Sequence, residues 1–132
     1  MSFDEIALTL PPDQAFNGVA HLVLGGLAVR LDLTVEMLED LELALDALLE
    51  RKGASDGETT VRVRVGKNDV RTIVGPFRET DLRDELERET VDALGLRRIL
   101  DTVADGVVIT DGIDAQWVEL TKRLGRARGE AA

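Results

Sequence analysis

The sequence contains no cysteine among its 132 residues. This absence excludes disulfide bonds, thiol catalysis and thiolate metal sites, and it gives no indication of an oxidising compartment. Basic residues are also scarce, since 16 lysines and arginines stand against 26 acidic residues and leave a net charge of −10. Such a charge repels phosphate backbones and anionic lipid surfaces, and the only basic clusters are Arg62 with Arg64 and the arginines near the C-terminus. We therefore expect no nucleic-acid and no membrane binding.

Long hydrophobic runs are missing as well. The longest, residues 18–29, is interrupted by His21 and is shorter than the roughly 20 residues that span a bilayer. The first residues include Asp4 and Glu5 and have no cationic start, which is not typical of a signal peptide. We expect a cytoplasmic protein with a single domain over residues 1–124 and a disordered tail over residues 125–132.

Hydrophobic periodicity predicts a strand and then two helices. Residues 3–10 alternate between apolar and polar and stop at a Pro-Pro pair, as a strand does. Asp13 and Thr34 suit the N-caps of helices over residues 14–31 and from residue 35 to a glycine-rich stretch at 53–57. The first helix has apolar residues at Phe16, Val19, Ala20, Val23, Leu24 and Leu27. Its glycine pair, Gly25 and Gly26, indicates close packing, a bend or contact with a second chain.

The second helix carries two stripes at helical spacing. Leucines at 38, 41, 45 and 48 predict the buried side, and four carboxylates predict a solvated side: Glu39, Glu42, Asp46 and Glu50. The carboxylates favour either a solubilising surface or a docking surface for a basic partner. His21, the only histidine, is interpreted as a packing residue rather than a ligand.

The second half of the chain predicts two hairpins around one helix. Residues 59–65 and 70–74 form the first hairpin, and residues 78–92 are heavily charged, which predicts an exposed and mobile helical connector. A core helix over 94–103 precedes a buried strand at 107–109, a turn at 111–112 and a strand over 113–124. Trp117 on that strand suits packing on the sheet or contact with a partner. This order predicts an α/β two-layer sandwich (α+β).

Three segments resemble one known family when they are taken together. They are the run from Asp40 to Asp46 (DLELALD), Val74 to Phe77 (VGPF) and Ile99 to Asp105 (ILDTVAD). Across about residues 3–124 the chain is similar to the anti-sigma-factor serine/threonine-kinase branch of the GHKL ATPases. The resemblance implies the histidine-kinase-like (Bergerat) fold, whose mixed, mostly antiparallel sheet is covered on one face by helices. It also implies a sigma factor or a STAS-type antagonist as the protein partner.

The resemblance places unsuitable residues at the two chemical positions of the second helix. In the family this helix carries a Glu that acts as the base and, four residues later, an Asn that coordinates the magnesium ion. A gapless match puts Ala47 and Arg51 at these positions. An alanine accepts no proton and an arginine has no lone pair for a metal, although Arg51 could pair with a phosphate. If the register differs by one residue, Asp46 and Glu50 are the alternative metal ligands.

The motifs expected to form the nucleotide pocket also lack most of their characteristic residues. The family's adenine-binding Asp falls at Thr72 or Ile73, and only Gly75 of that motif remains. The later glycine-rich motif has Leu96 at a key glycine position, which a shift of one residue would replace by Gly95. Gly75, Gly95 and Arg51 are therefore the remaining candidates for nucleotide contact, and we expect neither ATP nor magnesium as a cofactor.

Three functions remain open at this stage. The preferred one is a degenerate anti-sigma-factor kinase-like domain that binds its partner without catalysis. The second is an active ATP-dependent serine/threonine kinase with an altered site, which would need ATP and magnesium. The third is a structural or oligomeric module, for which a homodimer is the simplest form.

Overall fold

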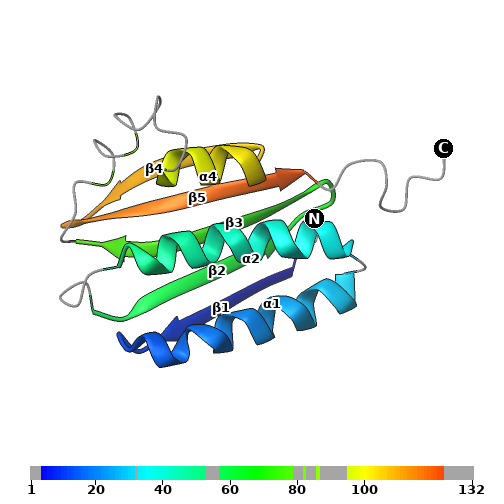
Figure 1. Ribbon diagram of the computed structural model, residues 1–132, viewed down its shortest axis with the longest axis horizontal. Helices are drawn as coiled ribbons and strands as arrows, with labels where there is room; N and C mark the ends of the chain where they lie inside the picture. The colour runs from blue at the N-terminus through cyan, green and yellow to red at the C-terminus, as the bar shows by residue number, and fades with distance from the viewer. Residues whose placement is uncertain are drawn as a thin grey trace.

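The computed structural model has two layers, a sheet and a set of helices that lie on one of its faces (Figure 1). It describes residues 4–31, 33–52, 57–78, 82, 86 and 95–123. The expected α/β two-layer sandwich is confirmed. The expected tail at 125–132 and most of the glycine-rich stretch at 53–57 lie outside the described residues.

The sheet has five strands in the order β1-β2-β3-β5-β4. Their bounds are β1 Asp4–Leu10, β2 Thr59–Val65, β3 Asp69–Phe77, β4 Gly106–Gly112 and β5 Ala115–Arg123. Every described strand pair is antiparallel. In β2 the alternate valines are buried and the residues between them are half-buried, as the period of two predicted. The two faces of the sheet therefore differ, and the described helices cover only one of them (Figure 1).

The second hairpin differs from its sequence-based prediction in two respects. Its turn lies at Ile113 and Asp114, two residues later than expected, and Asp114 adopts a positive φ of 57° that the turn requires. The predicted buried strand at 107–109 is the edge strand β4, in which the side chain of Val108 is 57% exposed. The prediction of burial was wrong because an apolar run does not reveal whether a strand is central or at an edge.

The first two helical segments begin where the sequence predicted, at residues 14 and 35, whereas the last begins at Leu96, two residues later than expected. A short 3-10 helix, η1 Gln14–Phe16, leads into α1 Asn17–Leu31, and these are followed by α2 Val35–Glu50 and α4 Leu96–Val103. The backbone N–H of Ala15 donates to Oδ1 of Asp13 at 2.9 Å, and that of Met37 donates to Oγ1 of Thr34 at 3.0 Å. Both predicted N-caps are confirmed, and each satisfies an otherwise unpaired donor at a helix start.

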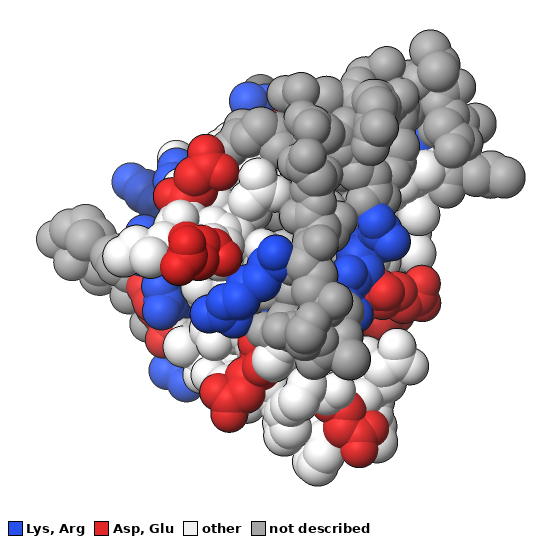
Figure 2. Space-filling view, turned by 90° about the vertical axis from the view of Figure 1, so that its left-hand side faces the viewer, with Lys and Arg blue, Asp and Glu red and all other residues white. Residues whose placement is uncertain are grey.

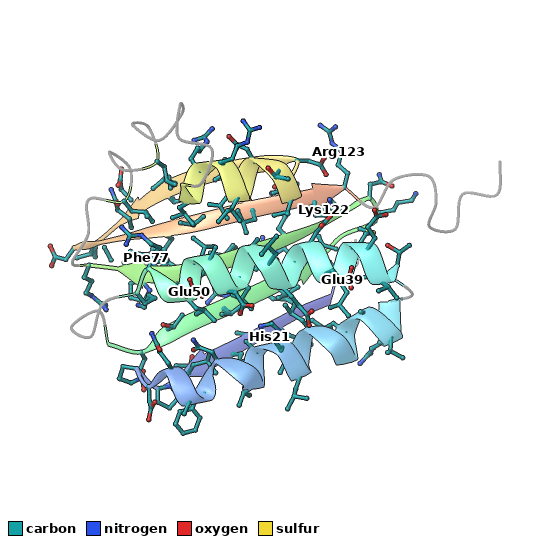
Figure 3. All side chains as sticks on the ribbon, in the orientation of Figure 1. His21, Glu39, Glu50, Phe77, Lys122 and Arg123 are labelled. Atoms are coloured by element: carbon teal, nitrogen blue, oxygen red, sulfur yellow. The ribbon has the colours of Figure 1, made fainter. Side chains whose placement is uncertain are left out.

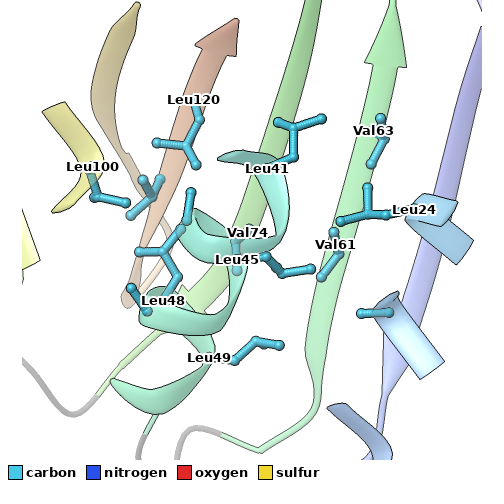
Figure 4. Packing of buried hydrophobic residues seen from close by; sticks show 14 of the residues in the cluster. Leu24, Leu41, Leu45, Leu48, Leu49, Val61, Val63, Val74, Leu100 and Leu120 are labelled. Atoms are coloured by element: carbon cyan, nitrogen blue, oxygen red, sulfur yellow. The ribbon is translucent and has the colours of Figure 1, made fainter. Parts of the chain in front are cut away.

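Helix α2 lies at the centre of the core. Its leucines at 41, 45, 48 and 49 are buried between the sheet and the neighbouring helices. Figure 4 shows Leu45 near Val61 and Val74, Leu48 toward Leu100, and Leu24 of α1 near Val63. The remaining expected stripe residue, Leu38, is half-buried at the margin of the core. Burial of this leucine stripe holds α2 on the sheet.

The charged connector contributes to the core. Leu82 and Leu86, two of its three apolar residues between 79 and 92, have side chains that are 0% and 1% exposed. The expectation of exposure was therefore wrong for these two residues. Their spacing of four places both on one side of a helical turn, and burial removes both from water. The other residues between 79 and 94 lie outside the described residues.

Helix α1 is apolar on its outer side as well as on its inner side. Leu24 and Leu27 are buried as expected, whereas Phe16 and Val19 are 42% and 37% exposed. A Cβ added at Gly25 or Gly26 would meet nothing within 4 Å. Close packing of the glycine pair inside the fold, one of the expectations, was therefore wrong, because the pair lies where no described part of the same chain approaches. No helix in the described residues is long and apolar enough to cross a membrane.

Candidate functional site

Helix α2 presents two different sides to its neighbours. Residues 40, 47 and 51 are spaced by seven and four, so they share one side of the helix. The carboxylate of Asp40 accepts a hydrogen bond from the Lys122 ammonium of β5 at 3.0 Å, which directs this side toward β5 and α4. The acidic residues Glu42 and Asp46 lie toward α1, where they contact His21. The positions that carry chemistry in the resembling family and the acidic stripe are therefore on opposite sides of α2.

On the side of α2 that faces β5, neither position 47 nor position 51, where the family carries its chemical residues, holds an acidic group. Ala47 is buried, with 9% of its surface exposed, and ends in a methyl group. Arg51 is the C-cap of α2, where its backbone N–H donates to the carbonyls of Leu48 and Leu49. Its side chain is exposed. Asp40, the carboxylate on this side, is already bound by Lys122.

Of the two residues expected at the adenine-binding position, Thr72 and Ile73, only Thr72 faces the helix layer. This side chain is buried with Val70 and Val74 on the covered face of β3, whereas Ile73 points to the other face and is half-buried. The Oγ1 of Thr72 has no hydrogen-bond partner in the described part of the chain. A threonine hydroxyl can donate and accept, but it carries no charge.

The two glycine candidates have different surroundings. Gly95 is the N-cap of α4 and is half-buried, without a side-chain hydrogen bond at the cap. Gly75 is buried beneath the indole of Trp117, because a Cβ at Gly75 would lie 2.6 Å from Cδ2 and Cε3 of that ring. The structure gives Gly75 a packing role and confirms that Trp117 packs on the sheet. Contact of either glycine with a nucleotide remains a prediction.

Lys52, next to the candidate Arg51, makes contacts that the sequence reasoning missed. Its ammonium donates to the carbonyl of Pro76 and lies 5.5 Å from the centroid of the Phe77 ring. A second contact joins the ammonium to the carbonyl of Glu58 at 3.4 Å. Lys52 thereby connects the C-terminal end of α2 to the ends of β2 and β3. The available signal was a cation next to a helix C-terminus, where it also offsets the helix dipole.

His21 joins α1 to α2 through two of the expected stripe residues. Its Nε2 lies 2.6 Å from Oδ1 of Asp46 and its Nδ1 lies 3.3 Å from Oε2 of Glu42. Figure 3 shows the histidine between the two helices. The hydrogen bond to Asp46 raises the pKa of His21 above its ordinary value of 6.5, burial opposes this, and the charges of Asp46 and Glu42 add to the increase. The expected packing role of His21 is confirmed, and the ion pairs are an addition.

The acidic stripe is therefore divided. Glu42 and Asp46 are half-buried against His21, whereas Glu39 and Glu50 are exposed on the outer side of α2. The alternative metal pair of Asp46 and Glu50 gains no third ligand, since no group of three metal-binding side chains occurs in the described ranges. Glu39 and Glu50 are thus the two exposed members of the expected stripe, and their contact with a partner remains a prediction.

Surface charge in the described part is mixed. Glu5 on β1 pairs with both Arg62 and Arg64 of β2, which were the main basic cluster expected from the sequence. The end of the molecule drawn in Figure 2 shows basic and acidic side chains next to each other rather than one extended basic region.

Comparison with known proteins gives a consistent set of relatives. No protein-family model matches the chain. A serine-protein kinase RsbW from Listeria monocytogenes serovar 1/2a is 30% identical over 126 residues, covering 79% of this chain and 78% of the relative. The proteins of the same name from L. monocytogenes serotype 4a and L. innocua serovar 6a are 29% identical with the same coverage. At this identity and coverage, the chain belongs to the family of the serine-protein kinase RsbW.

Proposed function

We propose that this chain is a cytoplasmic anti-sigma-factor-type regulator of the RsbW family that binds a protein partner without phosphorylating it. The partner class is a sigma factor or a STAS-type antagonist, as the family resemblance implies. Binding would act by occupancy, because a bound partner is withheld from its other interactions.

Ala47 is the observation that carries the proposal. It stands at the family's base position, and its methyl group is buried on the side of α2 that faces β5. Proton transfer by a positioned base contributes about 10²- to 10⁴-fold to a reaction rate. The cation at Arg51 is also unsuited to bind magnesium, because a guanidinium has no lone pair to donate. The base and the metal ligand are thus both missing from the same side of α2. A single acidic residue at a neighbouring position would replace only one of them and would not restore the chemistry.

The segment after β3 supports the same proposal. Leu82 and Leu86 belong to the hydrophobic core and are at most 1% exposed, as is Phe77 at the end of β3. A segment that opens and closes over a nucleotide would have to withdraw the two leucine side chains from the core. Burial of each leucine stabilises the closed segment by about 1.5–3 kcal/mol relative to exposure, so opening would be costly.

The exposed carboxylates favour a basic partner surface. Glu39 and Glu50 lie on the outer side of α2, where no ion pair of either residue occurs in the described part of the chain. Opposite charge on the partner would accelerate association and select the partner more than it would raise affinity. Glu42 and Asp46 would contribute less, since both face His21.

An active kinase with an altered site is the second candidate. It is favoured by the exposed guanidinium of Arg51 on the side of α2 that faces β5. It is also favoured by the N-terminus of α4, where the N-cap Gly95 offers no side-chain hydrogen bond to the helix. Both groups are able to contact phosphate oxygens.

Calorimetric titration with magnesium-ATP separates the two candidates. We expect no binding at concentrations below the millimolar range. We also expect no rise in melting temperature, since only a ligand that binds the folded state would stabilise it. The Listeria RsbW protein, measured in parallel, is the control for the assay. Saturable binding that disappears when magnesium is removed would favour the active kinase and overturn the proposal.

A second experiment tests the partner surface. Once a sigma factor or STAS-type antagonist is found to bind, Glu39→Lys and Glu50→Lys should each lower its association rate and weaken the dependence of that rate on salt. Glu58→Lys, at an exposed position outside α2, is the matched control and should leave the rate unchanged. Equal association rates for all four proteins would show that the outer side of α2 is ordinary solvated surface.

A further inference from the structure

A pocket lined mainly by polar side chains lies at the end of the molecule where α1 begins, α2 ends and β2 begins (Figure 1). Its volume is about 160 Å³. A cavity of about 150 Å³ holds one benzene molecule, so a small metabolite fits into this pocket. None of the candidate nucleotide contacts, Arg51, Gly75 and Gly95, lines it. The pocket is therefore separate from the positions considered for ATP.

The pocket is on the side of α2 that faces α1. Its apolar wall is Leu49, which shares a helix side with Glu42 and Asp46, the two carboxylates that contact His21. Ala47 and the ion pair of Asp40 are on the opposite side of the helix. A ligand in this pocket would thus leave the side of α2 that faces β5 unchanged.

The walls of the pocket are fixed by local structure. Strands β1 and β2 stay paired up to Thr59, and the β1 strand then continues into Pro11 and Pro12, whose rings fix their φ angles. A backbone N–H holds the carboxylate of Asp13, and two backbone carbonyls hold the ammonium of Lys52. A pocket whose groups are already positioned loses little conformational entropy when a ligand binds.

One negative and one positive side chain line this pocket without pairing with each other. Asp13 accepts the N–H of Ala15 at Oδ1, and it forms no ion pair in the described part of the chain. Lys52 brings a cation to the same pocket. A ligand with a single charge would be attracted by one of these groups and repelled by the other. A ligand that carries both signs can place each charge near its complement.

Thr59 adds a buried hydroxyl to the pocket. The inward-facing positions of β2 are Thr59 and three valines, and the side chain of Thr59 is 5% exposed. Within the described residues its hydroxyl has no hydrogen-bond partner. A buried hydroxyl without a partner costs free energy, and a ligand that accepts a hydrogen bond from it removes that cost. Thr59 therefore marks the position of an acceptor group of the ligand.

We propose that this pocket binds a small amino acid as its zwitterion, with the ligand ammonium at Asp13 and the ligand carboxylate at Lys52 and Thr59. Hydrogen bonds between charged groups are stronger than neutral ones, and this arrangement makes one at each end of the ligand. The half-buried amide of Asn17 can donate to or accept from a side-chain hydroxyl, which favours serine among amino acids of this size. The site shares no residue with the base and metal positions of α2, so it is independent of the proposed function.

NMR titration of the full chain, labelled with ¹⁵N, tests the ligand class with L-serine as the probe. We expect saturable shifts of the backbone amides at residues 13–17, 52 and 57–59, which surround the pocket. Ethanolamine lacks the carboxylate and 3-hydroxypropionate lacks the ammonium, so each should bind at least about tenfold more weakly. The absence of saturable shifts at tens of millimolar serine would overturn the proposal. So would equal binding of either analogue.

Three variants test the residues. Asp13→Asn keeps a good N-cap residue but removes the charge, and it should weaken serine binding at least about tenfold. Thr59→Val keeps the shape and removes the unpaired hydroxyl, so it should weaken binding without loss of stability in the absence of serine. Thr60→Val is the matched control, because Thr60 points to the other face of β2, where its hydroxyl contacts that of Thr9.

Serine should bind to Thr60→Val as tightly as to the wild type. Wild-type affinity in Asp13→Asn or Thr59→Val would show that the assigned groups do not contact the ligand and would overturn the proposal. An equal loss of affinity in Thr60→Val would do the same, since the effect would then not be specific to the pocket. Circular dichroism and urea unfolding of each variant separate a loss of contact from a loss of folding.

Discussion

Trp117 and Gly75 show how one pair of residues fixes the local packing of two neighbouring strands. The indole occupies the space above Gly75 where a Cβ would be, and it also lies 3.4 Å, at Nε1, from a Cβ built at Gly112. A glycine in a strand interior normally weakens the strand, so its presence here reflects the close approach of the ring.

We predict that Gly75→Ala destabilises the protein by about 1–3 kcal/mol, because the added methyl group would overlap the Trp117 ring. Gly106→Ala is the matched control on β4, where an added Cβ would make an ordinary contact at 3.7 Å with Thr121. Urea unfolding of the two variants provides the measurement. Equal stability of both variants would mean that the indole moves aside at no cost.

The ion pairs of His21 give the protein a specific dependence on pH. Both ring nitrogens face carboxylates of α2, and only the doubly protonated ring donates to both. The pKa of His21 is raised in the folded protein, so its contribution to stability is fully present below the ordinary value of 6.5. The contribution is lost as the pH rises through the higher pKa of the folded state.

We predict that the stability advantage of the wild type over His21→Gln declines as the pH is raised above 6.5 through the pKa of the folded protein. Chemical unfolding at several pH values measures this advantage, and NMR titration of the single histidine gives its pKa directly. Asp46→Asn should lower that pKa, because it removes the strongest contact. A pKa at or below 6.5 in the wild type would contradict the prediction.

At the scale of elements, helix α2 organises the molecule because three of its sides are in use. One side buries leucines on the sheet, a second pairs with His21 of α1, and a third carries Asp40 paired with Lys122 of β5. Glu39 and Glu50 are left on the fourth, exposed side. Fewer carboxylates of the acidic stripe are therefore exposed than the sequence indicated, and the proposed partner surface is correspondingly smaller.

The connector after β3 provides the clearest test at this scale. We predict that Leu82→Ala costs about 2–5 kcal/mol of unfolding free energy, because it removes a fully buried leucine and leaves a cavity. Ile113→Ala, in the exposed turn, should change stability by less than about 0.5 kcal/mol. Thermal and urea unfolding measure both. A negligible effect of Leu82→Ala would show that this connector is dispensable for the core, as a lid over a nucleotide would be.

At the scale of the whole molecule, the net charge of −10 opposes the compact state. We predict that sodium chloride raises the melting temperature, because an increase from about 0.01 M to 1 M shortens the Debye length from about 30 Å to 3 Å and weakens the repulsion. A scanning calorimetry series in salt measures the effect. A fall in melting temperature would mean that local ion pairs such as Lys122 with Asp40 outweigh the net repulsion.

The sequence by itself determined the two layers, the two N-caps and the leucine stripe of α2. These features follow from periodicity and from local hydrogen bonding, which involve residues close together in the chain. The same holds for Ala47 and Arg51, since their helical spacing was sufficient to place them on one side of α2.

The tertiary structure decided which side chains meet across the fold. His21 and Asp46 are 25 residues apart, and Lys52 and Pro76 are 24 residues apart, so no local pattern predicts either contact. The exposure of β4, the burial of Leu82 and the open space above Gly26 likewise depend on which elements are neighbours. Burial is set by the packing of segments that are distant in sequence, whereas helix starts and strand alternation are set by adjacent residues.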